Sequence, residues 1–175
     1  AEHLVQERER VDHAGVGDER HGLAFGHAGD QVHQVGVLHF DAHLDNYSHF
    51  GDDELSRCSP FYRVYNDPNM DPTKIAHIGI RGPRNHREEY NNAMKYGATV
   101  IRAIDVHEDG WKAAISKALE VVSKDTEYIY ITVCADSLDA ANMPQAPQDM
   151  GGLTSYELLM MLHEAGLAGA RGIDF

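Results

Sequence analysis

At 175 residues the chain suits one folded domain with a full core, and its 28 acidic and 15 basic residues give a formal net charge of −13. That charge argues against nucleic acid, whose phosphates need basic surfaces, and it suits a cationic small molecule. No apolar run reaches the length of about 18 residues that spans a membrane, and two cysteines form no disulfide framework, so we expect a cytoplasmic protein without a membrane partner.

The first 34 residues carry many charges and little apolar periodicity, which predicts poorly ordered structure. A His-rich tract can bind metal, but the irregular spacing here favours a solvated segment. The histidines concerned are His3, His13, His21, His27 and His33. We therefore expect a poorly patterned segment over residues 1–34 and one α/β domain over residues 35–175.

Residues 35–40 form an apolar run that predicts a buried strand, and Asp41, His43 and Asp45 follow it directly. If the chain stays extended, these three side chains point the same way while the residues between them point into packing. Two carboxylates and an imidazole suit a hard or borderline divalent cation, and the lack of thiolates in this segment argues against a structural zinc knot. A solvated acidic loop after a strand is the alternative for this segment alone.

Strands and helices then alternate along the chain. The helix over residues 110–123 is indicated by apolar side chains at helical spacing, and Gly97 closes the helix before it. His77 lies in the middle of a strand, and we interpret it as a satisfied surface or core imidazole rather than a ligand. The predicted elements are a short helix over 60–65, strands over 75–81 and 99–105, and helices over 85–96 and 110–123.

A second apolar run, residues 128–133, predicts a strand that ends in Cys134, Asp136 and Asp139. Further on, Thr154 and Glu157 have the form of a capping box for a helix that ends near Gly166, with Leu158, Leu159 and Leu162 facing the core, and residues 170–175 form a last strand. Such alternation implies a three-layer α/β/α fold with a mostly parallel sheet, whose carboxyl edge binds ligands.

Both acidic motifs resemble those of the ureohydrolases, the arginase and agmatinase family, and most closely its agmatinase-like branch. The family's first motif reads Asp-Ala-His-x-Asp, as residues 41–45 do. Its second reads Asp-x-Asp-x-x-Asp-Pro before a Pro- and Gly-rich loop, and residues 134–140 read Cys-Ala-Asp-Ser-Leu-Asp-Ala before Gly151-Gly152-Leu153-Thr154. The resemblance covers roughly residues 35–175, including Ile78-Gly79-Ile80-Arg81-Gly82 and Arg171-Gly172-Ile173-Asp174-Phe175.

The resemblance implies an arginase-like fold and a binuclear site, usually of Mn²⁺, whose bridging hydroxide attacks a guanidinium carbon and releases urea. Carried over by position, Asp41 is the ligand shared by both metals and His43 a ligand of one. Asp45 is a ligand of the other and the catalytic residue that accepts a hydrogen bond from the hydroxide. The further assignments are Asp136 as the last carboxylate ligand, Cys134 at the second bridging position, Asp139 as a residue that orders the loop, and Asn46 and Arg57 as substrate-binding residues.

Several positions depart from the family's pattern. A thiolate at Cys134 is softer than a carboxylate and offers one donor atom, so a softer metal or a single metal is expected. Arg57 replaces a histidine that relays protons; it stays protonated, but it can grip a substrate carboxylate. The family's Gly-Gly-Asp-His-Ser element is missing, with His21 the nearest substitute, and its guanidinium-binding Glu falls beyond Phe175. The resemblance therefore predicts a domain that is incomplete at its carboxyl end.

We predict a metal-dependent hydrolase of a linear guanidino compound that forms homo- or hetero-oligomers. The alternative is a catalytically degenerate family member that acts as a structural or regulatory subunit of a mixed oligomer, which Cys134, Arg57 and the missing histidine favour. A metal-dependent phosphoesterase on an unrelated α/β fold is less satisfactory, because it leaves the Gly-Gly-Leu-Thr and Ile-Gly-Ile-Arg-Gly runs unexplained.

Overall fold

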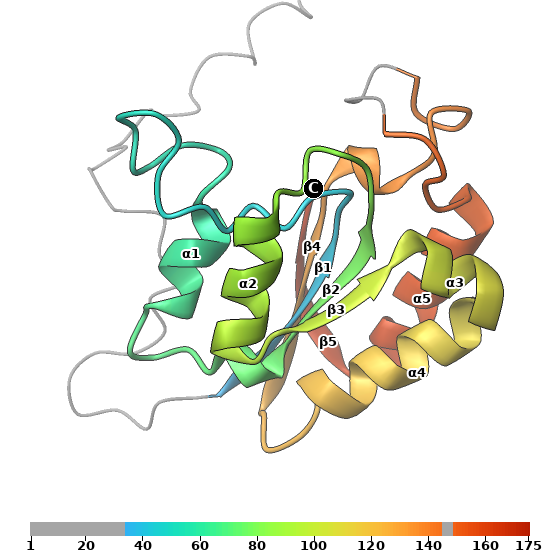
Figure 1. Cartoon of the computed structure of the whole chain (residues 1–175). Coiled ribbons are helices and arrows are strands. Elements are labelled where there is room, and N and C mark those ends of the chain that lie inside the picture. Colours follow the sequence, from blue (N-terminus) through green and yellow to red (C-terminus); the bar gives the residue numbers. More distant parts are fainter. Residues whose placement is uncertain (1–33, 145–148) are drawn as a thin grey trace, which may run out of the picture.

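A computed structural model describes residues 34–144 and 149–175. The predicted poorly ordered segment, residues 1–34, therefore lies outside the described residues except for Gln34. One sheet of parallel strands has the order β3-β2-β1-β4-β5 (Figure 1). The strands are β1 Val35–Phe40, β2 Ile75–Ile80, β3 Thr99–Arg102, β4 Tyr128–Val133 and β5 Ala170–Asp174. This arrangement confirms the predicted parallel sheet.

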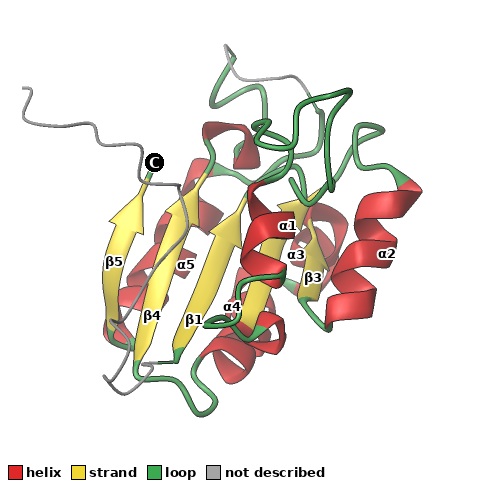
Figure 2. Cartoon of the chain, turned by 90° about the vertical axis from the view of Figure 1, so that its left-hand side faces the viewer, coloured by secondary structure: helices red, strands yellow, loops and turns green. Residues whose placement is uncertain are grey.

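Helices cover both faces of the sheet and make the predicted three layers. The α1 and α2 helices lie on one face, and α3, α4 and α5 lie on the other (Figure 2). On the α1 side, no described helix covers β4 and β5 (Figure 2). The helices are α1 Pro60–Tyr65, α2 Arg87–Tyr96, α3 Ala103–Asp109, α4 Trp111–Val122 and α5 Ser155–Leu167. None of the described helices is both long and apolar enough to cross a membrane.

Alternation along the strands builds a core on each side of the sheet. Leu38 and Phe40 of β1 belong to the larger core under α4 and α5, whereas Val35 and Val37 pack toward α1 with Phe61 and Tyr65. In β4 the odd-numbered residues are buried in the larger core and the even-numbered ones are half-buried. Each strand is therefore fixed in rotation about its own axis, which fixes the direction of the side chains that follow it.

Local signals place most of the helix ends correctly. Thr154 Oγ1 accepts from the Glu157 N–H at 3.2 Å while the Glu157 carboxylate accepts from the Thr154 N–H at 2.8 Å, as the capping box requires. The strand predicted over residues 99–105 is wrong beyond Arg102, because Asp105 accepts from the Arg102 N–H at 2.9 Å and closes the first turn of α3. Leu159, predicted to face the core, is exposed.

Two glycines test the packing in opposite directions. A Cβ added to Gly36 of β1 would stand 1.9 Å from the backbone oxygen of Val122 in α4. A Cβ added to Gly166 in α5 would have no neighbouring atom within 4 Å. We expect Gly36→Ala to lower the free energy of unfolding by about 2–3 kcal/mol through overpacking. Gly166→Ala should raise it by about 0.5–1 kcal/mol, because glycine is a poor helix former. Urea unfolding measures both, and a Gly36→Ala chain as stable as the wild type would contradict the close approach of β1 and α4.

Candidate metal centre

The register between β1 and β4 brings the two acidic motifs together. Phe40 and Val133 are partners across the parallel pair, so Asp41 and Cys134 leave the sheet side by side, tied by a hydrogen bond from the Cys134 N–H to the Phe40 oxygen at 2.8 Å. A short 3₁₀ helix, Ala135–Ser137, then turns Asp136 back, where its Oδ1 accepts from the Ala42 N–H at 3.2 Å. Two segments far apart in the sequence thus meet at one edge.

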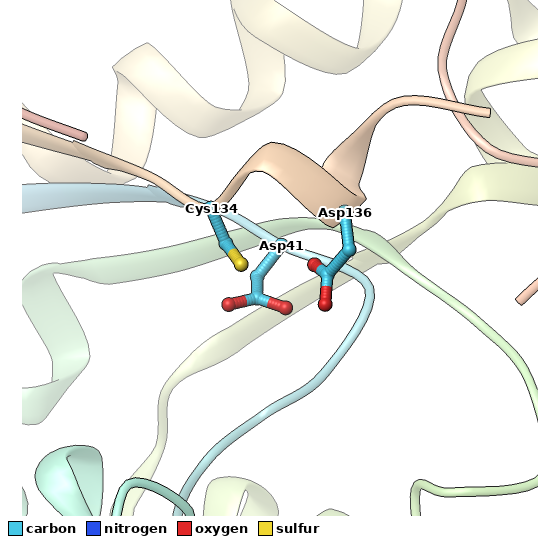
Figure 3. Close-up of side chains that lie close together, drawn as sticks. All are labelled: Asp41, Cys134 and Asp136. Carbon is cyan, nitrogen blue, oxygen red and sulfur yellow. The ribbon is translucent and has the colours of Figure 1, made fainter. Parts of the chain in front are cut away.

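Three of the predicted ligands form a compact group at this edge. One ligand atom from each of Asp41, Cys134 and Asp136 lies within 4.8 Å of the others, and Figure 3 shows their side chains gathered beside the ends of the strands. Both carboxylate residues are only 3% exposed. His43 borders the group, because its Nδ1 lies 3.3 Å from Asp41 Oδ1 and 3.1 Å from Asp136 Oδ2. Four predicted ligands therefore converge.

Asp149, which sequence reasoning missed, holds the other side of the His43 ring. His43 Nε2 lies 2.7 Å from Asp149 Oδ2, so a proton on Nε2 is donated outward and Nδ1 is directed at the group of ligands. Asp149 comes this close because Gly82 has no side chain: a Cβ there would lie 2.5 Å from the Asp149 carboxylate, and the φ of Gly82 is +78°. The loop that carries Asp149 has no regular pattern, so the sequence offered no signal for it.

The charges at this edge are balanced by imidazoles. Burial alone would raise the pKa of Asp41, but hydrogen bonds with His39 and His43 outweigh it and hold that pKa well below its ordinary value. Burial would lower the pKa of His43, yet hydrogen bonds with Asp136, Asp41 and Asp149 raise it to about 11. Since a ligating imidazole must lose the proton on its coordinating nitrogen, a cation bound here would take over the charge that the imidazolium now supplies.

Asp45 lies near the group in an unexpected backbone conformation. Its φ is +47°, so the extended geometry assumed for residues 41–45 fails at its last position, although Ala42 and Leu44 are fully buried as expected. The Asp45 carboxyl lines the cavities on both sides of Asp41. Burial, and then the negative charge of Asp41, raise its pKa to about 7.

Two cavities open onto these residues. The larger, of about 690 Å³, has a strongly charged wall, and the smaller, of about 530 Å³, has a more apolar one; Asp41, Asp45 and Cys134 line both. Arg57 lines the larger cavity. The other residues of the larger cavity are His43, Tyr47, Phe50, Cys58, Arg84, His86, Glu89 and Asp136.

The structure places Asn46 away from the cavities. Its side chain is fully buried and its Nδ2 donates to the backbone oxygen of Glu89 at 2.9 Å, so it ties the loop after β1 to α2. This position does not support the predicted contact with substrate. The Asp139 carboxylate accepts from the N–H groups of Ala141, Gly151 and Gly152, which agrees with a role in ordering the loop. His21 lies outside the described residues.

Comparison with known proteins identifies the family. The sequence matches the model of the arginase family over residues 17–175. It is 32% identical over 142 residues to a guanidinopropionase of Pseudomonas aeruginosa, covering 80% of this chain and 42% of the relative. It is 28% identical over 153 residues to an agmatinase of Chromobacterium violaceum, covering 87% of this chain and 44% of the relative.

A solved structure agrees with the sequence matches. The formimidoylglutamase of Bacillus subtilis superimposes with a TM-score of 0.74 at 27% identity, over 80% of this chain and 44% of that one. The chain therefore belongs to the arginase family and has its α/β fold, which confirms the resemblance. It spans less than half the length of these relatives.

The residues present fit a divalent cation. Two buried carboxylates, a thiol and an imidazole offer oxygen, sulfur and nitrogen donors within reach of one point, and buried carboxylates in such proximity need a positive charge. Burial, and then the charge of Asp41, raise the pKa of the Cys134 thiol, so it becomes a ligand only when a cation displaces its proton.

Asp149 provides a test of how the centre is built. If it orients His43, Asp149→Ala should weaken divalent cation binding about 10- to 100-fold, the usual effect of removing the partner of a ligating imidazole. Asp149→Asn retains an oxygen that accepts a hydrogen bond from His43 Nε2, so it should lose less cation affinity than Asp149→Ala. Isothermal titration of the chain with Co²⁺ measures both, and the exposed Asp52→Asn is the control for a lost surface charge. Equal affinities of wild type and Asp149→Ala would show that Asp149 does not position the ring.

Proposed function

We propose that this chain carries the metal centre of a hydrolase that releases urea from a linear guanidino compound. The single observation that carries the proposal is the convergence of Asp41, Cys134 and Asp136 within 4.8 Å at the carboxyl edge of an arginase-family sheet, with His43 beside them. A guanidinium carbon is a poor electrophile because its charge is delocalised. A cation held by these residues would supply the needed nucleophile by lowering the pKa of water.

The chain's own residues have distinct tasks in this proposal. Asp41, His43, Asp136 and Cys134 would hold the cation, which the family resemblance suggests is Mn²⁺ but which Cys134 shifts toward softer ions. Asp45, on the wall of both cavities, would accept a hydrogen bond from a water molecule and direct it at the guanidinium carbon. The buried carboxyl of Glu89 lines the larger cavity and offers oxygen acceptors for guanidinium N–H groups.

The larger cavity favours a guanidino acid over agmatine, although the sequence motifs alone pointed to the agmatinase-like branch. Agmatine carries a second cation at its far end, and a guanidino acid carries a carboxylate there. Arg57 and Arg84 line the cavity, and both are exposed. They attract a carboxylate and repel an amine. The relatives include both a guanidinopropionase and an agmatinase, so the choice rests on these two arginines.

The remaining expectations are part of the same proposal. We propose a cytoplasmic location and an oligomer, in keeping with the predictions from sequence. The formal net charge of −13 argues against nucleic acid as a partner. The two relatives and the solved structure described above all carry the names of enzymes, so we retain the hydrolase over the alternative of a non-catalytic subunit.

Urea release measures the proposed reaction directly. The chain loaded separately with Mn²⁺, Co²⁺ and Zn²⁺ should release urea from 3-guanidinopropionate or 4-guanidinobutyrate at least about tenfold faster than from agmatine, because one charge-assisted contact is worth about that factor. Metal content is measured on the same samples. A fully loaded protein that releases no urea from any of the three compounds would remove the proposed function.

The arginines supply the control for substrate choice. Arg57→Gln and Arg84→Gln each remove one positive charge from the cavity wall. Arg84 Nε also lies 3.8 Å from Asp149 Oδ2, so metal affinity is measured on both variants. Each should reduce kcat/KM for the guanidino acid while leaving that for agmatine equal or higher. If both substrates lose activity in proportion, the arginines support the loop rather than select the substrate.

Cys134 should determine which metal is held. Cys134→Asp restores the carboxylate of the family motif and should raise Mn²⁺ affinity by about tenfold or more, since hard oxygen donors suit Mn²⁺ better than sulfur. Cys134→Ser removes the sulfur without adding a carboxylate, so it separates the two effects. With Co²⁺, the wild type should show sulfur-to-metal charge-transfer absorbance that both variants lack. An unchanged Mn²⁺ stoichiometry and affinity in Cys134→Asp would contradict this account.

A further inference from the structure

Two histidines stand side by side on neighbouring strands beneath the metal centre. His39 of β1 and His77 of β2 are register partners in the parallel pair, and both are almost completely buried on the α1 side of the sheet. Their Nδ1 atoms lie 2.8 Å apart. At that distance one nitrogen must carry a proton and the other must offer a lone pair. The pair therefore has a direction, which its neighbours set.

The Nε2 atoms of the two histidines have different partners, a carboxylate that accepts hydrogen bonds and a hydroxyl that can donate one. His39 Nε2 lies 3.1 Å from Asp41 Oδ2, and His77 Nε2 lies 2.6 Å from the Tyr65 hydroxyl. An ionised Asp41 only accepts, so Nε2 of His39 carries a proton and, in a neutral ring, its Nδ1 accepts from His77. The second nitrogen of a neutral His77 then accepts from the Tyr65 O–H. Each donor in this row has one acceptor, and all donors point toward Asp41.

The surroundings bury the row and keep the His77 ring neutral. Burial lowers the pKa of His77 well below its ordinary value and raises that of Tyr65. Phe61 lies over both imidazoles, with ring centroids 4.2 Å from His39 and 4.7 Å from His77. Phe61 and Tyr65 are four residues apart on α1, so one face of that helix both covers the row and supplies its first donor.

We propose that Tyr65, His77 and His39 form a one-way hydrogen-bonded row that positions the Asp41 carboxylate for metal binding. His39 holds Oδ2, while Oδ1 accepts from the His43 N–H at 2.7 Å, so the carboxylate is fixed in rotation with lone pairs left for a cation. These are positioning residues, since they act through the Asp41 carboxylate. The proposal rests on the proposed function only in taking Asp41 as a ligand.

Histidine tautomers report the direction of the row without any catalysis. In the ¹⁵N-histidine-labelled chain at neutral pH, NMR should show His77 protonated on Nδ1 and His39 protonated on Nε2. Loss of single signals in His39→Gln and His77→Asn assigns the resonances among the 12 histidines. A His77 protonated on Nε2 would overturn the direction and with it the proposal.

Metal affinity tests the consequence for Asp41. His77→Leu leaves the buried Nδ1 of His39 without a donor and should weaken Co²⁺ and Mn²⁺ binding about 10- to 100-fold, as loss of an outer partner of a ligand does. His77→Asn places an amide N–H near the lost Nδ1–H and should bind within a few-fold of the wild type. Tyr65→Phe should weaken binding a few-fold and mix the His77 tautomers.

The controls separate positioning from folding. Tyr96→Phe removes a hydroxyl from the same group of rings, one that donates to Asn66 and lies outside the row, so its affinity should be unchanged. A folded His77→Leu, with the unfolding midpoint measured without metal, that binds as tightly as the wild type would overturn the proposal. If it does not fold, unchanged affinity and tautomers in Tyr65→Phe have the same force. If the wild type binds no cation but shows the expected tautomers, the proposed function is wrong, whereas the hydrogen-bonded row of Tyr65, His77 and His39 is supported.

Discussion

The structure depends on burying two carboxylates at the end of a parallel sheet. Asp41 and Asp136 lose their water, a cost that must be met by N–H donors and positive charge. Backbone N–H groups of Ala42 and His43 meet part of it, and the imidazoles of His39 and His43 meet more. All of these groups are presented because β1 and β4 end together. The metal centre is therefore a product of strand register, and any shift in that register would separate its halves.

A second constraint holds the loops above the sheet in place. The Arg81 guanidinium, at the end of β2, donates to the backbone oxygens of Asp136 at 2.7 Å, Leu138 at 3.1 Å and Asp149 at 2.9 Å. One rigid, planar group with several donors thus joins the loop that carries one ligand to the loop that positions His43. The close approach needs Gly152, where a Cβ would lie 2.5 Å from the Arg81 guanidinium. This explains physically why Ile-Gly-Ile-Arg-Gly and Gly-Gly-Leu-Thr occur together with the acidic motifs.

The sequence predicted what depends on local pattern and missed what depends on packing. Apolar runs located β1 and β4, and parallel topology then implied that Asp41, Cys134 and Asp136 meet. The extended backbone assumed after β1 failed at Asp45, because no local rule predicts a left-handed aspartate. Asp149 and the pairing of His39 with His77 depend on loop closure and on the register of β1 with β2, which one sequence does not encode in any short pattern. His77 was correctly interpreted as a satisfied imidazole, but its partners were invisible.

The substitution at Cys134 follows from the same charge balance. A carboxylate at this position, as the family motif has it, would add a third negative charge beside Asp41 and Asp136, which already share the imidazole of His43. The thiol of Cys134 is neutral because burial and the adjacent carboxylates raise its pKa. It therefore lowers the electrostatic cost of folding before any cation binds, and it lowers the attraction for a hard cation by the same change of charge. Stability of the metal-free protein and affinity for Mn²⁺ are opposed at this position, and Cys134 favours the former while keeping a donor atom for a softer ion.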